Sequence, residues 1–442
     1  MNHLCVGCGI CAALCPQGSI QMEFSPVHGF FLPSRSMDQC DTACGFCERV
    51  CPFVPENSDT AEISRGLFGS SEGIRHDDVL GYFHGTFAGY SEEHRMTSAS
   101  GGLVTWLLET LLERGEIDGA LCVGPDSTSP TLFGFRLCHT RDDIRSCAGS
   151  CYQPVDLSGA LRELLSRKGS YAVVALPCVA RSLRLAMQAN PQLRPRIRFI
   201  IGLVCGQMKS RHFVDYLIKK LGVQGNPLNI CFRHKRPDRP ASDFAFRFAL
   251  GNGHTADAGW SECIARPWGE RWFTLEVCDY CDDVFAECAD ATFMDAWLPE
   301  YVLDPRGHSL AIVRALKLLS IILREARLSG ISLAPIVVEK VCESQLDAIH
   351  QKRTLAILHK NRSRSPESLP MIRSVDRKLR PDHQWEALTK GRIRSITQHG
   401  IASDVKTLER RVRYLATPWT IANKLLMAAR LVRQMVRGEH FE

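Results

Sequence analysis

The 442-residue sequence lacks the segments that carry a protein into or across a membrane. Its first residues, MNHLCVGCG, contain no basic stretch followed by an apolar run, so we expect no secretory signal peptide. No stretch approaches the roughly 18 consecutive apolar residues of a transmembrane helix. We therefore expect a cytoplasmic protein, and disulfide bonds are rare in that compartment.

The sequence also has little that indicates nucleotide or nucleic-acid binding. It has no G-x-G-x-x-G motif between its first apolar helix and strand, so a standard dinucleotide-binding fold is not indicated. No nucleic-acid recognition motif accompanies its basic residues, and we expect no nucleic acid as a partner.

What remains is the composition of a soluble globular protein with an uneven charge. Hydrophobic residues make up 45% and charged residues 23%, and the length allows two or three domains. The net charge is +6, but residues 351–442 hold 20 Lys and Arg against 8 Asp and Glu. The preceding residues hold 34 against 40, so the basic charge belongs to the tail.

Cysteine is abundant, with 20 residues, and in a reducing compartment this indicates metal or redox chemistry. Residues 1–57 contain two runs, C-x2-C-x2-C-x3-C-P and C-x3-C-x2-C-x3-C-P, and resemble a bacterial two-cluster ferredoxin domain. In such domains the last Cys of each run binds the other cluster. The runs therefore predict one [4Fe-4S] cluster on Cys5, Cys8, Cys11 and Cys51, and a second on Cys40, Cys44, Cys47 and Cys15. A pair of structural zinc sites is the alternative, but zinc motifs do not need the doubled Cys-Pro ending.

Glycine and proline support the same interpretation of the two runs. Gly7, Gly9 and Gly45 allow the backbone to turn closely and point amides at sulfur, and Pro16 and Pro52 end the local helical turns. Residues 52–80 are rich in Ser, Glu, Asp, Gly and Pro, which predicts a linker that wraps onto the body.

Beyond the linker, the segment SASGGLVTWLLETLLERGEIDGALCVG predicts a helix over 103–112 and then a strand. Ser98 or Ser100 is a candidate N-cap, and Gly101 and Gly102 open the first turn. A glycine-rich helix N-terminus can bind phosphate, because its free amides point at the anion. An ordinary capped helix is the alternative.

Two further strands each end at a cysteine. The strand YAVVAL leads to Cys178 and RFIIGLV leads to Cys205, each followed by a helical segment. Ligands of open α/β sheets bind at this carboxyl edge. Together with the C-x2-C pair Cys278 and Cys281, the four thiols predict a third [4Fe-4S] cluster.

The alternative for any single cysteine is a small buried hydrophobe. We adopt this interpretation for five residues: Cys122, Cys138, Cys231, Cys263 and Cys342. Cys288 is a spare candidate for the third cluster, and the roles of Cys147 and Cys151 stay open.

The motifs SASGG, GSCYQP, ALPCVARSLR, GLVCGQMKS and CDYCDDVFAECADATFMDAW follow one another behind the two cysteine runs. In this order they resemble the family of coenzyme F420 hydrogenase/dehydrogenase β subunits over residues 1–345. The resemblance implies an iron–sulfur flavoprotein whose FAD exchanges electrons with a deazaflavin or another organic substrate. It favours a bacterial branch that occurs with surface-polysaccharide genes.

The resemblance implies particular site residues. FAD contacts fall on Ser100, Gly101, Gly102 and Ser150, in a flavin-binding region over 80–155. The cluster cysteines Cys178, Cys205, Cys278 and Cys281 fall in a second region over 156–345, in which Asp295 matches the acidic position before Trp297. The sequence departs from many relatives at Cys151, Gly206 and Met294, where Lys, His and a small residue are usual, so F420 binding is not carried over.

Residues 351–442 lie outside this resemblance and form a basic, helical tail. Apolar residues recur at helical spacing between arginines, and seven could form one face: Trp419, Leu425, Leu426, Met427, Leu431, Val432 and Met435. The tail is either a helix packed on the body with a solvated basic face, or an interfacial helix drawn to anionic lipids or an acidic partner.

Taken together, the sequence predicts a multidomain α+β and α/β protein: a two-cluster ferredoxin domain, an α/β flavin-binding body and a helical basic tail. We expect an oxidoreductase that passes electrons between [4Fe-4S] clusters and FAD, with ferredoxin or another one-electron carrier as partner and an unidentified organic substrate. The alternatives are a non-catalytic electron-transfer subunit that serves a separate enzyme, and a deazaflavin-dependent β subunit.

Overall fold

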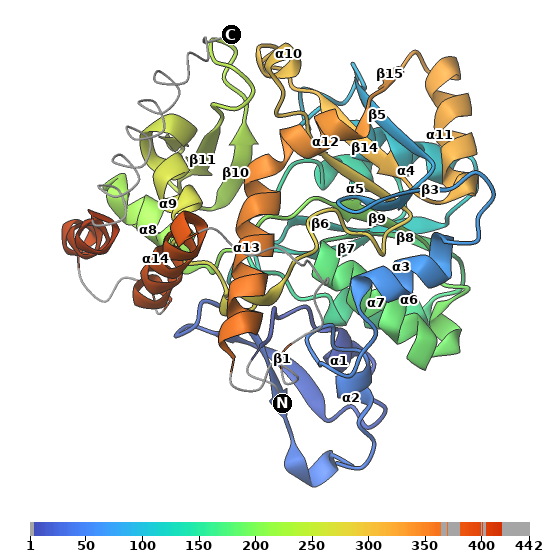
Figure 1. Cartoon of the computed structure of the whole chain (residues 1–442), viewed down its shortest axis with the longest axis horizontal. Helices are drawn as coiled ribbons and strands as arrows, with labels where there is room; N and C mark the ends of the chain where they lie inside the picture. Colours follow the sequence, from blue (N-terminus) through green and yellow to red (C-terminus); the bar gives the residue numbers. More distant parts are fainter. Residues whose placement is uncertain (1–3, 364–368, 370–380, 399, 401–403, 418–442) are drawn as a thin grey trace.

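The computed structural model describes residues 4–363, 369, 381–398, 400 and 404–417. A large mixed sheet lies at the centre of the molecule (Figure 1). Its eight strands are β5 (Gly85–Tyr90), β6 (Gly119–Pro125), β7 (Phe133–Cys138), β8 (Tyr171–Ala175), β9 (Ile197–Leu203), β13 (Ala291–Asp295), β14 (Ser309–Val313) and β15 (Ser332–Pro335). They are arranged in the order β15-β5-β14-β13-β9-β8-β6-β7.

The four central strands β13, β9, β8 and β6 pair in parallel, and the outer strands pair antiparallel. The carboxyl ends of β13, β9 and β8 therefore meet at one edge of the sheet, and the strands predicted from YAVVAL and RFIIGLV are confirmed as β8 and β9. Because residues alternate between the two faces of a strand, Ala172 and Ile201 contribute to one core and Val173 and Ile200 to the other.

Helices cover both faces of the sheet. One core contains residues of α4 (Leu103–Glu113), α5 (Arg141–Ser146) and α11 (Leu316–Leu328), and the other contains residues of α6 (Ser158–Ser166) and α7 (Pro177–Ala189). The predicted helix over 103–112 is confirmed as α4, but neither Ser98 nor Ser100 caps it. Its N-cap is Gly102, which has a left-handed backbone with φ 81° and no side chain to accept a hydrogen bond.

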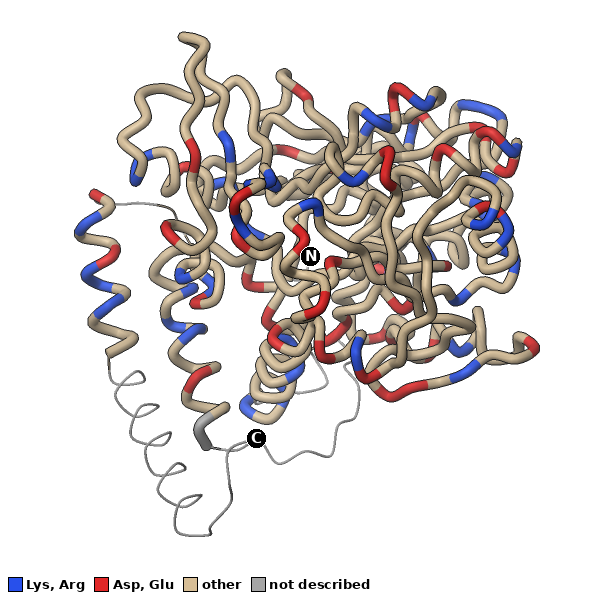
Figure 2. The backbone as a smooth tube through the Cα atoms, turned by 90° about the horizontal axis from the view of Figure 1, so that it is seen from above, with Lys and Arg blue, Asp and Glu red and all other residues tan. Residues whose placement is uncertain are grey.

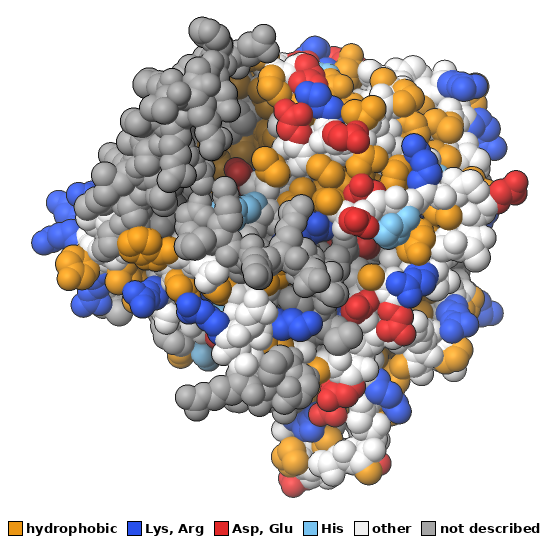
Figure 3. All heavy atoms as spheres, viewed as in Figure 1, with side chains coloured by type: hydrophobic (Ala, Val, Ile, Leu, Met, Phe, Trp, Pro, Cys, Tyr) orange, Lys and Arg blue, Asp and Glu red, His pale blue; other side chains and the backbone are white. Residues whose placement is uncertain are grey.

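The N-terminal module packs against α6 and α7. It consists of α1 (Ile10–Ala13), β1 (Ile20–Ser25), β2 (Phe30–Arg35), a 3-10 turn (Met37–Gln39) and α2 (Phe46–Arg49). The amide of Leu157 donates to the carbonyl of Cys8 at 3.0 Å, and the hydroxyl of Ser182 donates to that of Val50 at 2.6 Å. The module projects from the body as a narrow lobe (Figure 3).

The segment predicted as a linker contains regular structure. Residues 60–83 form α3 (Thr60–Phe68), β3 (Arg75–Asp77) and β4 (Gly81–Phe83). Asp59 caps α3 by accepting from the amide of Glu62 at 2.7 Å, and Ile63 and Phe68 are buried. The polar composition concealed this helix because it buries only a narrow apolar face.

A second, three-stranded sheet stands beside the main one. Its strands are β10 (Asn229–His234), β11 (Ala245–Ala249) and β12 (Thr255–Gly259), and α8 (His212–Lys220) shares their aromatic core. Cys231 is exposed here, so its assignment as a buried residue is wrong. Its neighbours Ile230 and Phe232 point into the core, which leaves Cys231 on the outer face.

The described part of the tail is helical and lies on the body. Its helices are α13 (Leu346–Arg362), α14 (Pro381–Thr397) and residues 405–417, preceded by α12 (Val338–Ser344). Leu408, Val412 and Ala416 are buried in the aromatic core. The predicted apolar face from Trp419 to Met435 lies outside the described residues. Both signs of charge are spread over the molecule (Figure 2), and no described helix is long and apolar enough to cross a membrane.

Candidate functional site

The structure brings Cys5, Cys8, Cys11 and Cys51 together at the base of the N-terminal module. Burial, with a charge on Cys51 as a smaller cause, raises the pKa of Cys5 to about 11 and that of Cys11 to about 12. The amide of Gly7 donates to the Cys5 Sγ at 3.3 Å. Thiols in such surroundings need a bound cation to become thiolates. This first set therefore combines Cys5, Cys8 and Cys11 of the first run with Cys51, the last cysteine of the second run, as expected if each run lends its last cysteine to the other cluster.

The second set, Cys15, Cys40, Cys44 and Cys47, lines one cavity near the outer end of the module. The cavity holds about 390 Å³ of empty space, part of it open to solvent. The Arg35 guanidinium donates to the Cys47 Sγ at 3.0 Å. Burial raises the pKa of Cys15, but hydrogen bonds from Ser19 and nearby amides outweigh burial and lower it. A charge on Cys47 also acts on Cys11 and Cys51, so the two sets adjoin.

The third set converges at the carboxyl edge of the main sheet. Cys178 is in the first turn of α7, Cys205 follows β9, and Cys278 and Cys281 are in and after the 3-10 helix η4 (Glu276–Tyr280). Burial raises the pKa of Cys178 well above its ordinary value, and charges on the other three thiols raise it further. The amide of Met208 donates to the Cys278 Sγ at 3.3 Å.

The first and third sets adjoin across a shared apolar cluster. Cys8, Cys51, Cys178 and Cys278 all pack in it, and a charge on Cys8 acts on Cys178. The other buried members of the cluster are Leu4, Val6, Phe53, Leu275 and Val277. No group of three His, Cys, Asp or Glu side chains within the described ranges has the geometry to hold a single metal ion. A cubane does not require such a group, because each thiolate binds a different iron.

Charged residues that the sequence did not indicate surround the third set. The Lys352 ammonium of α13 donates to the carbonyl of Asp283 at 2.5 Å, and the Cys281 Sγ contacts the same oxygen at 3.8 Å. Burial lowers the pKa of Lys352, but charges on Cys281 and Cys205 outweigh burial and raise it above its ordinary value. No cysteine pattern points to a lysine 71 positions after Cys281 in the basic tail.

Two arginines fix η4 between the C-x2-C cysteines. Arg271 and Arg394 each donate to a different oxygen of the buried Asp279, both at 2.8 Å. Arg394 belongs to α14, so the tail helps to hold the loop that carries Cys278 and Cys281. Tyr280 packs its ring against His359 of α13, with ring centroids 4.6 Å apart.

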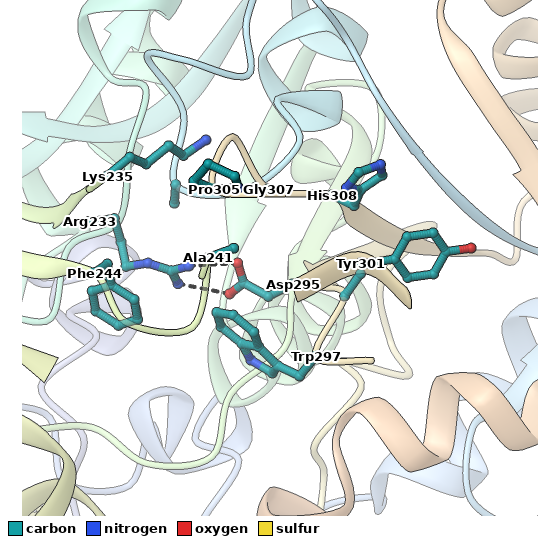
Figure 4. Close-up of a pocket in the computed structure, with 12 residues that line it drawn as sticks. Arg233, Lys235, Ala241, Phe244, Asp295, Trp297, Tyr301, Pro305, Gly307 and His308 are labelled. Carbon is teal, nitrogen blue, oxygen red and sulfur yellow. Dashed lines mark hydrogen bonds and ion pairs between the residues drawn. The ribbon is translucent and has the colours of Figure 1, made fainter. Parts of the chain in front are cut away.

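A pocket lies at the same sheet edge, beyond β13 (Figure 4). Arg233 donates two hydrogen bonds of 2.8 Å to the carboxylate of Asp295, the last residue of β13. Its guanidinium lies over the rings of Phe244, at 4.0 Å, and Trp297, at 5.1 Å. The ion pair is thus fixed, and Asp295 presents a positioned carboxylate rather than a free base.

The predicted FAD contacts Ser100 and Gly101 already have partners within the chain. The Ser100 hydroxyl donates to the carbonyl of His308 at 2.5 Å, and the Gly101 amide donates to the Ser309 hydroxyl at 2.9 Å. These bonds tie the loop to β14 beside the pocket. The first-turn amides of α4, after Gly102, have no partner within the helix.

Ser150 does not join this group. It lies half-buried in the loop between α5 and α6, and it shares no hydrogen bond with Ser100, Gly101 or Gly102 in the described part of the chain. A basic residue that the sequence did not indicate is closer: the Lys235 ammonium donates to the carbonyls of Ser100, at 2.8 Å, Arg306, at 2.5 Å, and Arg95.

The cysteines with open roles are separate from these sets. Cys288 is buried beneath α7 and contacts the carbonyl of Thr60 at 3.9 Å. The Cys147 Sγ lies 3.7 Å from that of Cys138, and Cys151 packs in the aromatic core.

Comparison with protein families gives the same division of the chain. Residues 86–162 match the N-terminal model, and residues 168–335 the C-terminal model, of the coenzyme F420 hydrogenase/dehydrogenase beta subunit. The chain belongs to this family. Residues 4–54 match the model of a 4Fe-4S dicluster domain, so the N-terminal module is an iron–sulfur domain. The helices α13 and α14 lie beyond the matched residues.

Two curated relatives come from methanogenic archaea. The chain is 26% identical over 226 residues to a subunit of the F(420)H(2) dehydrogenase of Methanosarcina mazei, and the match covers 50% of this chain and 57% of the relative. It is 24% identical over 237 residues to coenzyme F420-dependent sulfite reductase of Methanocaldococcus jannaschii, and this match covers 50% of this chain and 34% of the relative. The matches thus span between a third and three fifths of these relatives' lengths.

A solved structure shares the fold. A chain in the F420-reducing [NiFe] hydrogenase complex from Methanosarcina barkeri superposes with a TM-score of 0.50 at 18% sequence identity. The superposition covers 66% of this chain and 97% of that chain. At this identity the match concerns the architecture alone.

Proposed function

We propose that this chain is an iron–sulfur electron-transfer subunit that connects a one-electron carrier to a deazaflavin or a related organic redox compound. The observation that carries the proposal is the continuity of the three cysteine sets. They adjoin one another from the outer end of the N-terminal module to the sheet edge that bears the pocket.

The proposed ligands are the three sets described above, each for one [4Fe-4S] cluster. When bound, these clusters supply one-electron transfer. The residues of the chain hold the thiols in apolar surroundings, donate amides to sulfur, as Gly7 does to Cys5 and Met208 to Cys278, and keep neighbouring sets in contact.

We assign the organic redox compound to the pocket beyond β13, whose lining includes Ala99 and His308. Arg233, Asp295 and Trp297 offer a fixed ion pair and an aromatic wall there. The names of the two archaeal relatives refer to coenzyme F420, which makes a deazaflavin the first compound to test. The protein partner at the outer end is a one-electron carrier such as a ferredoxin, or another subunit of an enzyme complex.

A second candidate is a self-contained FAD-dependent oxidoreductase, as the sequence led us to expect. The observation in its favour is the pocket beside Ser100–Gly102, where the first-turn amides of α4 remain for a phosphate. FAD would be held there with Ser150 as a further contact, and an organic substrate would bind over it.

Anaerobic purification followed by iron, sulfide and flavin analysis tests the proposal. We expect about twelve irons and as many sulfides per chain, four for each cubane. Each molecule of reduced coenzyme F420 gives up two electrons and should then reduce two one-electron clusters, which is followed by EPR and by the deazaflavin absorbance. Zinc in place of iron, or clusters that no deazaflavin reduces, would contradict the proposal. One FAD per chain that is reduced by a substrate without a deazaflavin would support the second candidate instead.

A further inference from the structure

Lys352 is a buried cation that makes one hydrogen bond among the residues that the structure describes. Its side chain lies in the interior with the residue only 2% exposed. An ammonium group has three N–H donors. The one acceptor recorded for it among the described residues is the Asp283 carbonyl, at 2.5 Å. A buried charge is costly unless it is paired, so a further negative partner is expected.

The thiols around Lys352 are those of the third set. Its charge interacts with Cys281, Cys205 and Cys278, in addition to the Asp283 carboxylate. The carbonyl that accepts its hydrogen bond also contacts the Cys281 Sγ at 3.8 Å. The ammonium and the Cys281 Sγ therefore meet at one backbone oxygen, and three of the four thiols lie close enough for their charges to act on Lys352.

The helix that carries Lys352 is fixed along its length. At its start, Gln345 donates to the Asp295 carbonyl at 2.9 Å, beside the pocket. One turn on, Ala348 packs against Gly206, where a Cβ would lie 3.5 Å from the Ala348 Cβ. Lys352 follows after another turn, and the helix passes the C-x2-C loop (Figure 1). An alanine at position 206 would therefore be in ordinary van der Waals contact with α13.

We propose that Lys352 is a positioning residue that supplies a fixed positive charge to the third [4Fe-4S] cluster and raises its reduction potential. The inference rests on the proposed function, because it assumes that a cluster binds there. One electron enters the site on reduction, and no bond forms or breaks. Four thiolates already make the site negative, so the added charge is stabilised by a nearby cation. Net charge and hydrogen bonds to sulfur are known determinants of cluster potentials.

The test is an EPR-monitored redox titration of the full chain carrying Lys352→Met, with dithionite as the one-electron donor. Methionine keeps the length of the side chain and removes the charge. The matched control is Lys360→Met, on the same helix at an exposed position. We expect one-electron reduction of the third cluster to become at least tenfold less favourable, and a tenfold change corresponds to about 59 mV. The N-terminal clusters and the Lys360→Met variant should keep the wild-type potentials.

An unchanged potential in Lys352→Met would overturn the proposal, as would an equal shift in Lys360→Met. If Lys352→Met fails to hold the third cluster, Lys352→Arg is the deciding variant, because arginine retains the charge. A tenfold or larger change in its equilibrium constant for one-electron reduction, relative to wild type, would overturn the proposal. Iron analysis of the unaltered protein separates failure of the proposed function from failure of this inference. If the unaltered protein holds iron for two clusters only, the third cluster is absent and the proposed function fails.

Discussion

At the scale of single residues, the third set of thiols is built from parts distant in sequence. Cys178, Cys205 and the C-x2-C pair arrive from two strand ends and one short helix, and burial raises the pKa of Cys178 and of Cys278. Free thiols gain nothing from this convergence, since a charge on one disfavours a charge on the next. A cationic iron core removes that conflict.

Replacement of both Cys278 and Cys281 by serine should therefore remove about four irons per chain, the content of one cubane. The N-terminal clusters should stay visible by EPR. The control is Cys342→Ser, because Cys342 is half-buried in α12 and belongs to none of the three sets. Full iron content in the double variant would make these cysteines ordinary core residues.

The second prediction for single residues concerns the ion pair between Arg233 and Asp295 in the pocket. Asp295→Asn should destabilise the chain by about 3–5 kcal/mol, because it leaves the buried Arg233 without its counter-charge. Asp257→Asn is a matched control: Asp257 makes the same two-pronged contact with Arg247, but both side chains are more than a third exposed. That loss should be about 0–1 kcal/mol. Denaturant unfolding of the two variants measures the difference, and equal losses would refute this account.

At the scale of elements, α4 is held in place by one buried carboxylate. Glu109 accepts from Arg145 at 2.6 Å and from Arg141 at 2.9 Å, and it lies 3.2 Å from the ring of His94. Burial raises the pKa of Glu109, but its hydrogen bonds and charge contacts with these partners, Arg145 first among them, outweigh burial and lower it below its ordinary 4.5. The ionised carboxylate therefore fixes α4 against α5 and against the loop that leads to Ser100.

Glu109→Gln should cost about 1.5–3 kcal/mol at neutral pH, the range for hydrogen bonds to charged groups. The pKa of Glu109 is depressed in the folded state, so its contribution is complete above pH 4.5 and is lost as the pH falls through the folded-state value. The stability difference from wild type should thus narrow below pH 4.5. Glu113→Gln, half-exposed one turn later on the same helix, is the control. A difference that does not depend on pH would contradict the role of the carboxylate.

The elements that sequence predicted best are those fixed by local pattern. The apolar runs before Cys178 and Cys205 favour buried strands, and the spacing of Leu103 to Leu112 is helical. The helix α3 was missed because a capped, mostly polar segment resembles a loop until its tertiary partner is known. Cys231 was misassigned because the alternation of β10 becomes informative only when its buried face is identified. Lys352, Arg35 and the Arg233–Asp295 pair depend on packing between distant segments, which no local pattern specifies.

At the scale of the whole molecule, the N-terminal module packs directly against the body rather than forming a separate, tethered domain. The backbone of Cys8 and the cap of α6 meet at Gly9, and the apolar cluster between Cys8 and Cys178 continues across the junction. Electron transfer between the module and the sheet edge therefore depends on this packing as well as on the ligands themselves.

Gly9→Ala should disturb the junction. Gly9 has φ 78°, and a Cβ there would lie 1.8 Å from the Asp156 Oδ1 and 3.0 Å from the amide of Ser158. Asp156 must then release the amide of Ser158, from which it now accepts a hydrogen bond at 2.9 Å, and this loosens the contact between the module and the start of α6. Gly18→Ala is the matched control, because Gly18 also has a left-handed backbone, φ 62°, with no described neighbour within 4 Å of its Cβ position. Both variants share the backbone cost of about 1–2 kcal/mol, and only Gly9→Ala adds a clash between module and body.

We expect both to retain iron, and Gly9→Ala alone to slow electron transfer from the N-terminal clusters to the third cluster in rapid-mixing experiments. Equal slowing in Gly18→Ala, or none in Gly9→Ala, would show that the junction does not carry the electrons.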